Sequence, residues 1–176
     1  MLFRSFEALG ATVKIAGDKY IIDAPELNGA DITFDFPSVG ATINIMLAAV
    51  KANGQTRIFN AAKEPEIVNI ADFLKSMGAK IKGAGTDTIT ITGVKKLSKG
   101  HIYTIPDRIE AGTYIIAGAL AGDHLVIDKI EPKHLESLLT TLKNMNVDYI
   151  LEENSIIISK HPLLNHLLLL RNLLME

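Results

Sequence analysis

Short runs of alternating apolar and polar residues recur along the chain. Each run follows a stretch with an amphipathic helical pattern, and these stretches end in similar sequences. The runs are rich in β-branched residues, so they are predicted to be strands: YIID at 20–23, TITIT at 88–92 and SIIIS at 155–159. The preceding patterns are FEALGATV at 6–13, FLKSMGAKI at 73–81 and TLKNMNVDY at 141–149. Leu142 follows Leu74 by 68 residues, and Lys and Met positions nearby match as well. The pattern therefore predicts an internal repeat.

The similarity continues upstream of these elements. The blocks KEPEIVNIADFL (63–74) and IEPKHLESLLTTL (130–142) both place Glu-Pro before an amphipathic helix, where the missing N–H of proline is tolerated. Two further matching blocks precede them: PSVGATINIMLAAVKANG (37–54) and PDRIEAGTYIIAGALAG (106–122). The first is predicted to form a helix that ends at Gly54, and the second a helix that ends at Gly122. Strands are expected on both sides of these helices. The predicted unit is strand, helix, strand, helix, strand, strand.

The repeats predict how the chain is organised. We expect one complete unit over 27–93, another over 97–160, and only the end of a preceding unit over 1–24. Residues 1–160 are thus expected to form most of one α/β domain, and the Leu-rich stretch 161–176 is expected to be a divergent tail, read in a shifted frame. Because a missing neighbouring unit leaves apolar faces uncovered, self-association through these faces is also expected.

Composition narrows the classes of function. The chain has 176 residues, 48% of them hydrophobic and 22% charged, which is typical of a soluble globular protein. The net charge of −2 provides no basic field, so no nucleic-acid partner is expected. The absence of cysteine excludes disulfides and thiolate ligands, and the scattered histidines predict no metal and no cofactor. No signal peptide and no membrane span are predicted, which favours a cytoplasmic protein.

The turn from strand to helix at Ser38 is the strongest candidate for a binding site. A helix start presents unpaired N–H groups and a partial positive charge, Ser38 can cap it, Gly40 leaves room for close approach, and Thr42 adds a second hydroxyl. A phosphate or diphosphate would fit there, although a capping serine alone also explains the pattern. The matching turn carries Asp107 and Glu110, a capping box whose carboxylates would repel an anion.

Other charged residues have structural explanations as well as functional ones. Arg108 can pair with Glu110 or Glu64, or reach into a cleft. Glu64 and Glu66 flank Pro65 at a predicted helix start, where acidic side chains complement the helix dipole without a catalytic role.

Three long blocks resemble a known family: residues 36–50, 60–94 and 105–120. They are similar to the UDP-N-acetylglucosamine 1-carboxyvinyltransferase family of enolpyruvyl transferases, and the resemblance runs from about residue 3 to 160. It implies an inside-out α/β barrel of repeated βαβαββ units. It also implies that Ser38, Val39 and Gly40 contact the diphosphate and uridine side of UDP-N-acetylglucosamine, with Phe36 at a position where some members carry lysine.

The resemblance implies transfer of the enolpyruvyl group from phosphoenolpyruvate to the 3-hydroxyl of UDP-N-acetylglucosamine, a step of peptidoglycan synthesis. The family's acid, base and phosphoenolpyruvate-binding arginines fall outside the matched region. We therefore expect no catalytic residue in this chain, phosphoenolpyruvate binding only with the missing parts, and no activity alone. Two alternatives stay open: a non-catalytic remnant that binds UDP-sugar weakly at most, and a domain like that of 3-phosphoshikimate 1-carboxyvinyltransferase.

Overall fold

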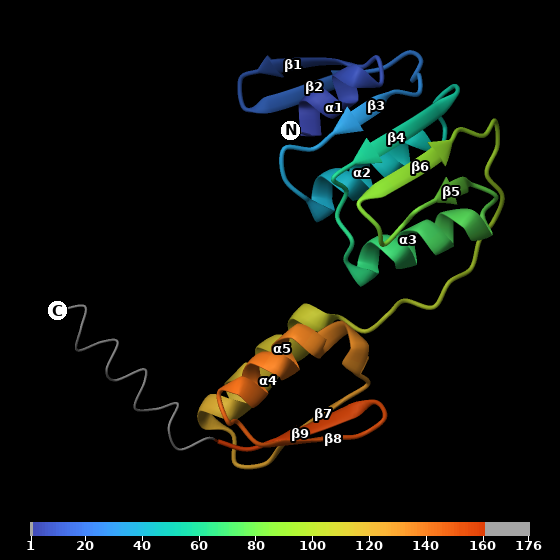
Figure 1. Cartoon of the computed structure of the whole chain (residues 1–176). Helices are drawn as coiled ribbons and strands as arrows, with labels where there is room; N and C mark the ends of the chain where they lie inside the picture. The colour runs from blue at the N-terminus through green and yellow to red at the C-terminus, as the bar shows by residue number, and fades with distance from the viewer. Residues whose placement is uncertain (1, 161–176) are drawn as a thin grey trace. The chain divides into compact units, whose positions relative to one another are not determined.

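The computed structural model describes residues 2–160, which form two compact units (Figure 1). Unit 1 spans Met1–Thr104 and unit 2 spans Ile105–Glu176. The boundary lies within the second predicted repeat. The grouping of 1–160 into one domain stays a prediction, and the predicted tail at 161–176 lies outside the described residues. No helix in the described part of the chain is long and apolar enough to cross a membrane.

Unit 1 contains one complete copy of the predicted repeat. Its elements follow the predicted order: β3 (Asp31–Thr33), α2 (Val39–Ala49), β4 (Gln55–Phe59), α3 (Pro65–Ser76), β5 (Lys80–Lys82) and β6 (Thr88–Thr92). They form a four-stranded sheet of order β3-β4-β6-β5. Only β3 and β4 are parallel, because α2 carries the chain back to the starting edge between them. The elements over 27–93 thus occur in the order strand, helix, strand, helix, strand, strand, while the division of the chain into repeats stays a prediction.

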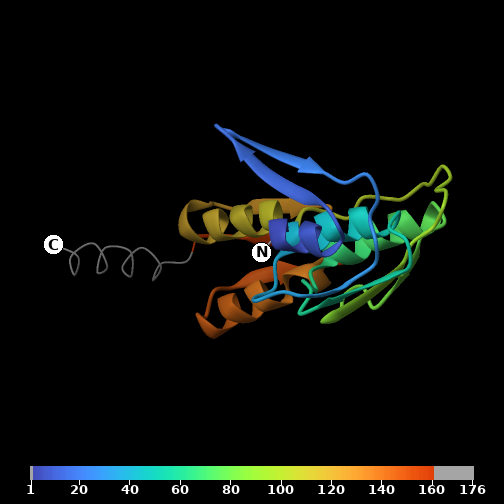
Figure 2. The same cartoon turned by 90° about the horizontal axis from the view of Figure 1, so that it is seen from above.

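The alternation of β6 sorts its side chains between the two faces of this sheet. Ile89 and Ile91 are fully buried, while the threonines of the same strand lie half-exposed on the other face. Ile58 of β4 pairs with Ile89 and continues the buried row. The helices α2 and α3 cover this apolar face, as Figure 2 shows from above. The hydrophobic pattern of β6 therefore explains why both helices pack on the same face of the sheet.

The first residues of unit 1 form a helix and a hairpin, in the same order as α3, β5 and β6 at the end of the complete copy. Helix α1 (Leu2–Ala8) leads into a hairpin of β1 (Thr12–Ala16) and β2 (Lys19–Asp23). Gly10 has a φ of +95° and Gly78 a φ of +99°, so α1 and α3 leave for their hairpins through the same left-handed turn. The order of helix and hairpin is the one seen at the end of the complete copy, and the assignment of this segment to a preceding repeat stays a prediction.

Unit 2 has the elements α4 (Arg108–Ala121), β7 (Leu125–Asp128), a 3₁₀ turn η1 (Pro132–Leu135), α5 (Glu136–Asn144), β8 (Tyr149–Leu151) and β9 (Ser155–Ile158). Its three strands form an antiparallel sheet of order β7-β9-β8. Buried Ile115, Leu139 and Ile156 join the helices to this sheet. The second Glu-Pro pair, Glu131 and Pro132, thus lies at the start of the 3₁₀ turn η1. The predicted helix, α5, follows this turn directly.

Two sequence predictions were wrong. The first strand expected in the second complete unit does not form within the described residues. Tyr103 lies where Phe34 lies in the first copy, yet it is 85% exposed against 1%, and its carbonyl accepts a hydrogen bond from Asn69 Nδ2 at 3.1 Å. The helix α2 ends at Ala49, not at Gly54, because the backbone of the following residues bonds to other segments, including Asn53 N–H to the Leu27 carbonyl. Gly122 caps α4 as predicted.

Candidate anion site at the start of α2

The candidate site lies where the parallel strands β3 and β4 both end. Thr33 and Phe59 pair at this edge, and α2 and α3 each begin just after it (Figure 1). Asn60 Nδ2 donates to the Phe34 carbonyl at 3.0 Å, so the two connecting segments are tied together. Ligands of α/β sheets bind at the carboxyl ends of parallel strands, because helix starts gather there. This edge is therefore the most suitable place for an anion in unit 1.

Ser38 caps α2, as the sequence predicts. Its backbone is extended, its carbonyl accepts from Thr42 N–H at 2.9 Å, and its Oγ accepts from Ala41 N–H at 3.3 Å. In the part of the chain that the structure describes, no acceptor bonds to the N–H groups of Val39 and Gly40. Both groups point out of the helix start, where the dipole favours negative charge. The turn thus retains two donors for a ligand.

Gly40 faces open space. A Cβ built on it would have no heavy atom within 4 Å, and the residue is exposed. Protein packing therefore does not require a glycine here. A ligand that approaches the backbone closely would require one.

Thr42 does not belong to the binding surface. Its side chain is fully buried, and its Oγ1 accepts from Ala62 N–H at 3.0 Å. The expectation that its hydroxyl assists an anion is wrong, because the hydroxyl fastens the segment after β4 to α2. Lys63, which follows Ala62 along the chain, is exposed. The sequence had marked this lysine only as the start of a helical block.

The charges nearest the turn do not oppose an anion. Asp35 pairs with Arg4 of α1 at 2.5 Å, which offsets the only carboxylate between β3 and α2. Both side chains are largely exposed, so the pair is weak. Phe36 is 61% exposed, and its side chain provides no positive charge for this turn. Binding at this turn would depend on backbone donors and the Ser38 hydroxyl.

The corresponding turn of unit 2 is acidic. The Asp107 carboxylate caps α4 by accepting from the N–H groups of Ile109 at 2.8 Å and Glu110 at 3.0 Å. Asp107, Glu110 and Asp128 line one hollow of about 350 Å³, together with Lys129. The N–H groups of Ile109 and Glu110 are thus occupied, and three carboxylates line the hollow beside one lysine. The Asp107 cap forms as predicted, while the prediction that only the Ser38 turn accepts an anion stays a prediction.

The remaining predicted site residues are divided between the two units, with Glu64 in unit 1 and Arg108 and Glu110 in unit 2. Arg108 is the first residue of α4 and lines a second hollow of about 480 Å³ with His134 and Thr141. Glu64 precedes α3 without capping it, and no partner within the described residues bonds to its buried Oε2. The pairings of Arg108 with Glu64 or Glu110 stay predictions.

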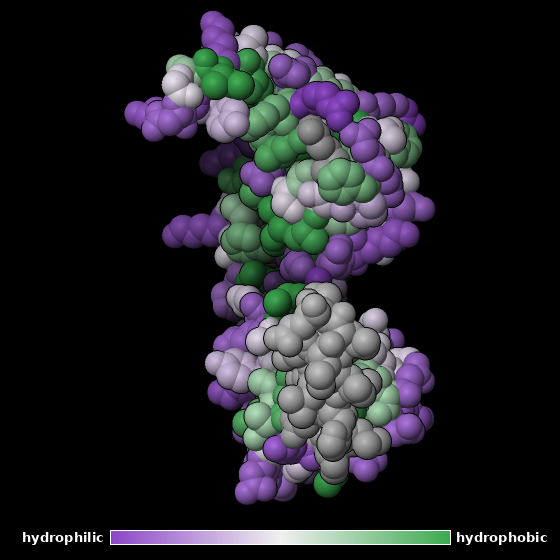
Figure 3. All heavy atoms as spheres, turned by 90° about the vertical axis from the view of Figure 1, so that its left-hand side faces the viewer, coloured by the Kyte–Doolittle hydropathy of each residue, from purple (hydrophilic) through white to green (hydrophobic). Residues whose placement is uncertain are grey.

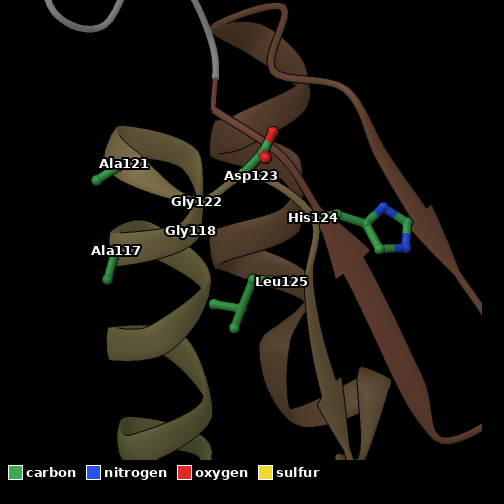
Figure 4. A pocket seen from close by; sticks show the side chains of 7 residues that line it. All are labelled: Ala117, Gly118, Ala121, Gly122, Asp123, His124 and Leu125. Carbon is green, nitrogen blue, oxygen red and sulfur yellow. The ribbon is translucent and has the colours of Figure 1, made fainter.

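A further hollow, of about 390 Å³, lies at the C-terminal end of α4 (Figure 4). The side chains of Asp123 and His124 point in different directions there. The backbone of Gly118 and Gly122 lies between these two side chains and Ala121. A helix end presents carbonyl oxygens and partial negative charge, which oppose a phosphate. This hollow is therefore not an alternative anion site. In the described range 2–160, no three His, Cys, Asp or Glu residues are grouped as a metal would require.

Comparison with known proteins identifies the family. The family model described as EPSP synthase (3-phosphoshikimate 1-carboxyvinyltransferase) matches residues 1–171. The chain is 55% identical over 155 residues to UDP-N-acetylglucosamine 1-carboxyvinyltransferase 2 of Geobacillus kaustophilus, and 54% identical over 154 residues to UDP-N-acetylglucosamine 1-carboxyvinyltransferase of Clostridium botulinum. The chain belongs to the EPSP synthase family of enolpyruvyl transferases.

This enolpyruvyl transferase chain represents only part of its relatives. The matches cover 88% and 87% of the chain but 36% and 37% of the two relatives. Among solved structures, the enolpyruvyl transferase NikO from Streptomyces tendae covers 92% of the chain at a TM-score of 0.80 and 23% identity, with 42% of NikO covered. EPSP synthase from Acinetobacter baumannii gives a TM-score of 0.61 at 20% identity, covering 90% of the chain and 38% of that enzyme. These likenesses show the fold.

Proposed function

We propose that this chain contributes the diphosphate-binding turn of a UDP-N-acetylglucosamine 1-carboxyvinyltransferase. The observation that carries the proposal is the open start of α2, where no acceptor among residues 2–160 bonds to the N–H groups of Val39 and Gly40 beside the Ser38 hydroxyl. The relatives at 54% to 55% identity are named for UDP-N-acetylglucosamine, which carries a diphosphate. In this proposal, Ser38 keeps its cap and the two backbone donors receive phosphate oxygens.

The expected strength of this contact is modest. A helix end contributes about 0.3 to 1 kcal/mol toward an anion, and a hydrogen bond to a charged group about 1.5 to 3 kcal/mol. Phe36 adds no charge, while the exposed Lys63, in the segment between β4 and α3, can raise the local potential. We therefore expect weak binding by the chain alone, with the remainder of the affinity supplied by other parts of the enzyme.

In this proposal the whole enzyme transfers the enolpyruvyl group from phosphoenolpyruvate to UDP-N-acetylglucosamine, in the cytoplasm, for peptidoglycan synthesis. The repeated units of the chain would form part of an inside-out α/β barrel. The resemblance places the acid, the base and the phosphoenolpyruvate-binding arginines outside the matched region, so in this proposal phosphoenolpyruvate binding and catalysis belong to other segments of the enzyme. The chain alone would be inactive.

A ligand titration separates this proposal from its alternatives. The purified chain would be titrated with UDP-N-acetylglucosamine, with shikimate 3-phosphate and with N-acetylglucosamine, and amide shifts would be followed by NMR. Saturable binding of the UDP-sugar alone is the expected result. Binding of shikimate 3-phosphate instead would favour the EPSP synthase activity, and a folded chain that binds none of the three would favour a non-catalytic remnant.

A further inference from the structure

The connection between β3 and α2, residues 34–38, leads from the sheet to the proposed anion site. Residues 35–37 are all exposed, and the ion pair of Asp35 with Arg4 is weak, so neither burial nor charge holds this connection in place. It runs along the left of unit 1 in Figure 1, on the side that faces the viewer in Figure 3, where hydrophilic and hydrophobic side chains are mixed. The position of the Ser38 turn therefore depends on contacts at the two ends of the connection.

Phe34 is the fixed point at the first end. It is 1% exposed, and its N–H donates to the Phe59 carbonyl at 3.1 Å, just after the last pair of the parallel ladder between β3 and β4. Because β4 ends at Phe59, no further strand residue is available to bond to the Phe34 carbonyl. The side chain of Asn60 takes that place, since its Nδ2 donates to this carbonyl at 3.0 Å. A side-chain hydrogen bond thus extends the ladder by one residue.

The backbone of Asn60 explains why a side chain provides this bond. Its φ is +55°, a left-handed conformation, and the next N–H group, that of Ala61, donates to the Asp87 carbonyl at 2.9 Å beside β6. The backbone has therefore turned from one neighbour of β4 to the other. Asparagine tolerates a left-handed conformation and also supplies an N–H donor, whereas glycine would supply the conformation alone. Backbone freedom by itself does not account for an asparagine at this position.

The same short segment after β4 also holds the far side of the turn. The N–H of Ala62 donates to Thr42 Oγ1 at 3.0 Å, and both residues are fully buried. Thr42 ends the first turn of α2, and its own N–H donates to the Ser38 carbonyl. The segment after β4 therefore contacts the chain on both sides of Ser38, at positions 34 and 42. The proposed donors of the anion site lie between these two points.

We propose that Asn60 is a positioning residue for the anion site, and that it acts through the Phe34 carbonyl and not through contact with the ligand. Its hydrogen bond fixes the path of the chain toward Ser38. The N–H groups of Val39 and Gly40 then keep the direction in which they would meet a diphosphate. Because hydrogen bonds weaken steeply when donor and acceptor are misaligned, a shift of this path lowers affinity without removing a donor. The inference rests on the proposed function for its ligand, but not for the contact that fixes the turn.

Asn60→Gly in the full chain tests this role, because glycine permits the same backbone φ and removes the side-chain donor. NMR gives two measurements: hydrogen exchange of backbone amides without ligand, and a titration with UDP-N-acetylglucosamine. Exchange at Ala41, whose N–H bonds to Ser38 Oγ, should quicken about tenfold, while exchange at Ile91 in the centre of the sheet should change by less than about twofold. The Kd for UDP-N-acetylglucosamine should rise about tenfold.

Asn146→Gly is the matched control. Asn146 has nearly the same φ, +56°, in unit 2, so this variant repeats the backbone change outside unit 1 and should leave both measurements unaltered. If Asn60→Gly left exchange at Ala41 unchanged, or quickened it equally at Ile91, Asn60 would have no role specific to the turn and the proposal would be overturned. An unchanged Kd in a chain that binds would overturn it as well. A folded wild-type chain that binds no UDP-N-acetylglucosamine would contradict the proposed function, and the exchange measurement would still decide whether Asn60 positions the turn.

Discussion

Replacement of Gly40 with alanine should stabilise unit 1 while weakening ligand binding. A Cβ at this position meets no heavy atom within 4 Å, so the methyl group causes no clash in the folded chain. Alanine in a helix is favoured over glycine by about 0.4 to 1 kcal/mol. The free energy of unfolding of unit 1 should rise by about that amount.

The same methyl group would lie close to the N–H groups that we propose bind the diphosphate. Loss of one hydrogen bond to a charged group, about 1.5 to 3 kcal/mol, corresponds to a tenfold or larger rise in the Kd for UDP-N-acetylglucosamine. Opposite signs for stability and binding would distinguish a ligand contact from a packing requirement. Calorimetric titration gives the Kd, and urea unfolding followed by NMR peaks of unit 1 gives the stability.

Gly118→Ala is the control for packing. Its Cβ would lie 2.5 Å from Ile158 Cγ2 and 3.1 Å from Leu125 Cδ2, so unit 2 should lose about 1 to 3 kcal/mol. UDP-N-acetylglucosamine binding should not change. If Gly40→Ala destabilised unit 1, or left an established Kd unaltered, the proposed approach of the ligand to this backbone would be refuted.

Other substitutions test single contacts. Thr42→Val should cost unit 1 about 1 to 3 kcal/mol in urea unfolding, since the buried Ala62 N–H loses its acceptor, and an unchanged midpoint would contradict this. Phe36→Lys should lower the Kd for UDP-N-acetylglucosamine a few-fold at low salt and less at high salt; a salt-independent gain would exclude a charge contact. The hydrogen bond from Arg57 holds the pKa of Asp31 below its ordinary value, so this carboxylate stabilises unit 1 above about pH 4 and ceases to as the pH falls through its folded pKa. Arg57→Ala should raise that pKa in a carbon-detected NMR titration. The chain mixed with both substrates should release no phosphate, and any release by pure protein would overturn the assignment of catalysis to other segments.

Much of the fold followed from periodicity in the sequence. The alternation of TITIT matches β6 residue for residue, and Pro65 opens α3 as expected. The errors arose where tertiary contacts decide. Tyr103 occupies a strand position in the repeat, but a side-chain bond from Asn69 holds its segment, and a sequence pattern carries no record of such a contact.

The candidate site was predictable to a similar degree. The caps at Ser38 and Asp107 follow from residue types that accept hydrogen bonds from the N–H groups of a helix start. The role of Thr42 could not be predicted, because its bond to Ala62 spans 20 residues and depends on how α2 packs beside β4. Asp128 adds a third carboxylate to the turn at Asp107, and this too could not be predicted, because it depends on how β7 packs beside the start of α4.

The most direct test is a residue-resolved titration that uses the second turn as an internal control. Amide shifts of Val39, Gly40 and Ala41 would be followed with increasing UDP-N-acetylglucosamine, beside those of Ile109 and Glu110. Saturable shifts at the α2 start alone, lost in Ser38→Asp, are the expected result, since a carboxylate there would repel the diphosphate. Shifts at the α4 start, or no shifts at the α2 start of a folded chain, would contradict the proposed diphosphate site.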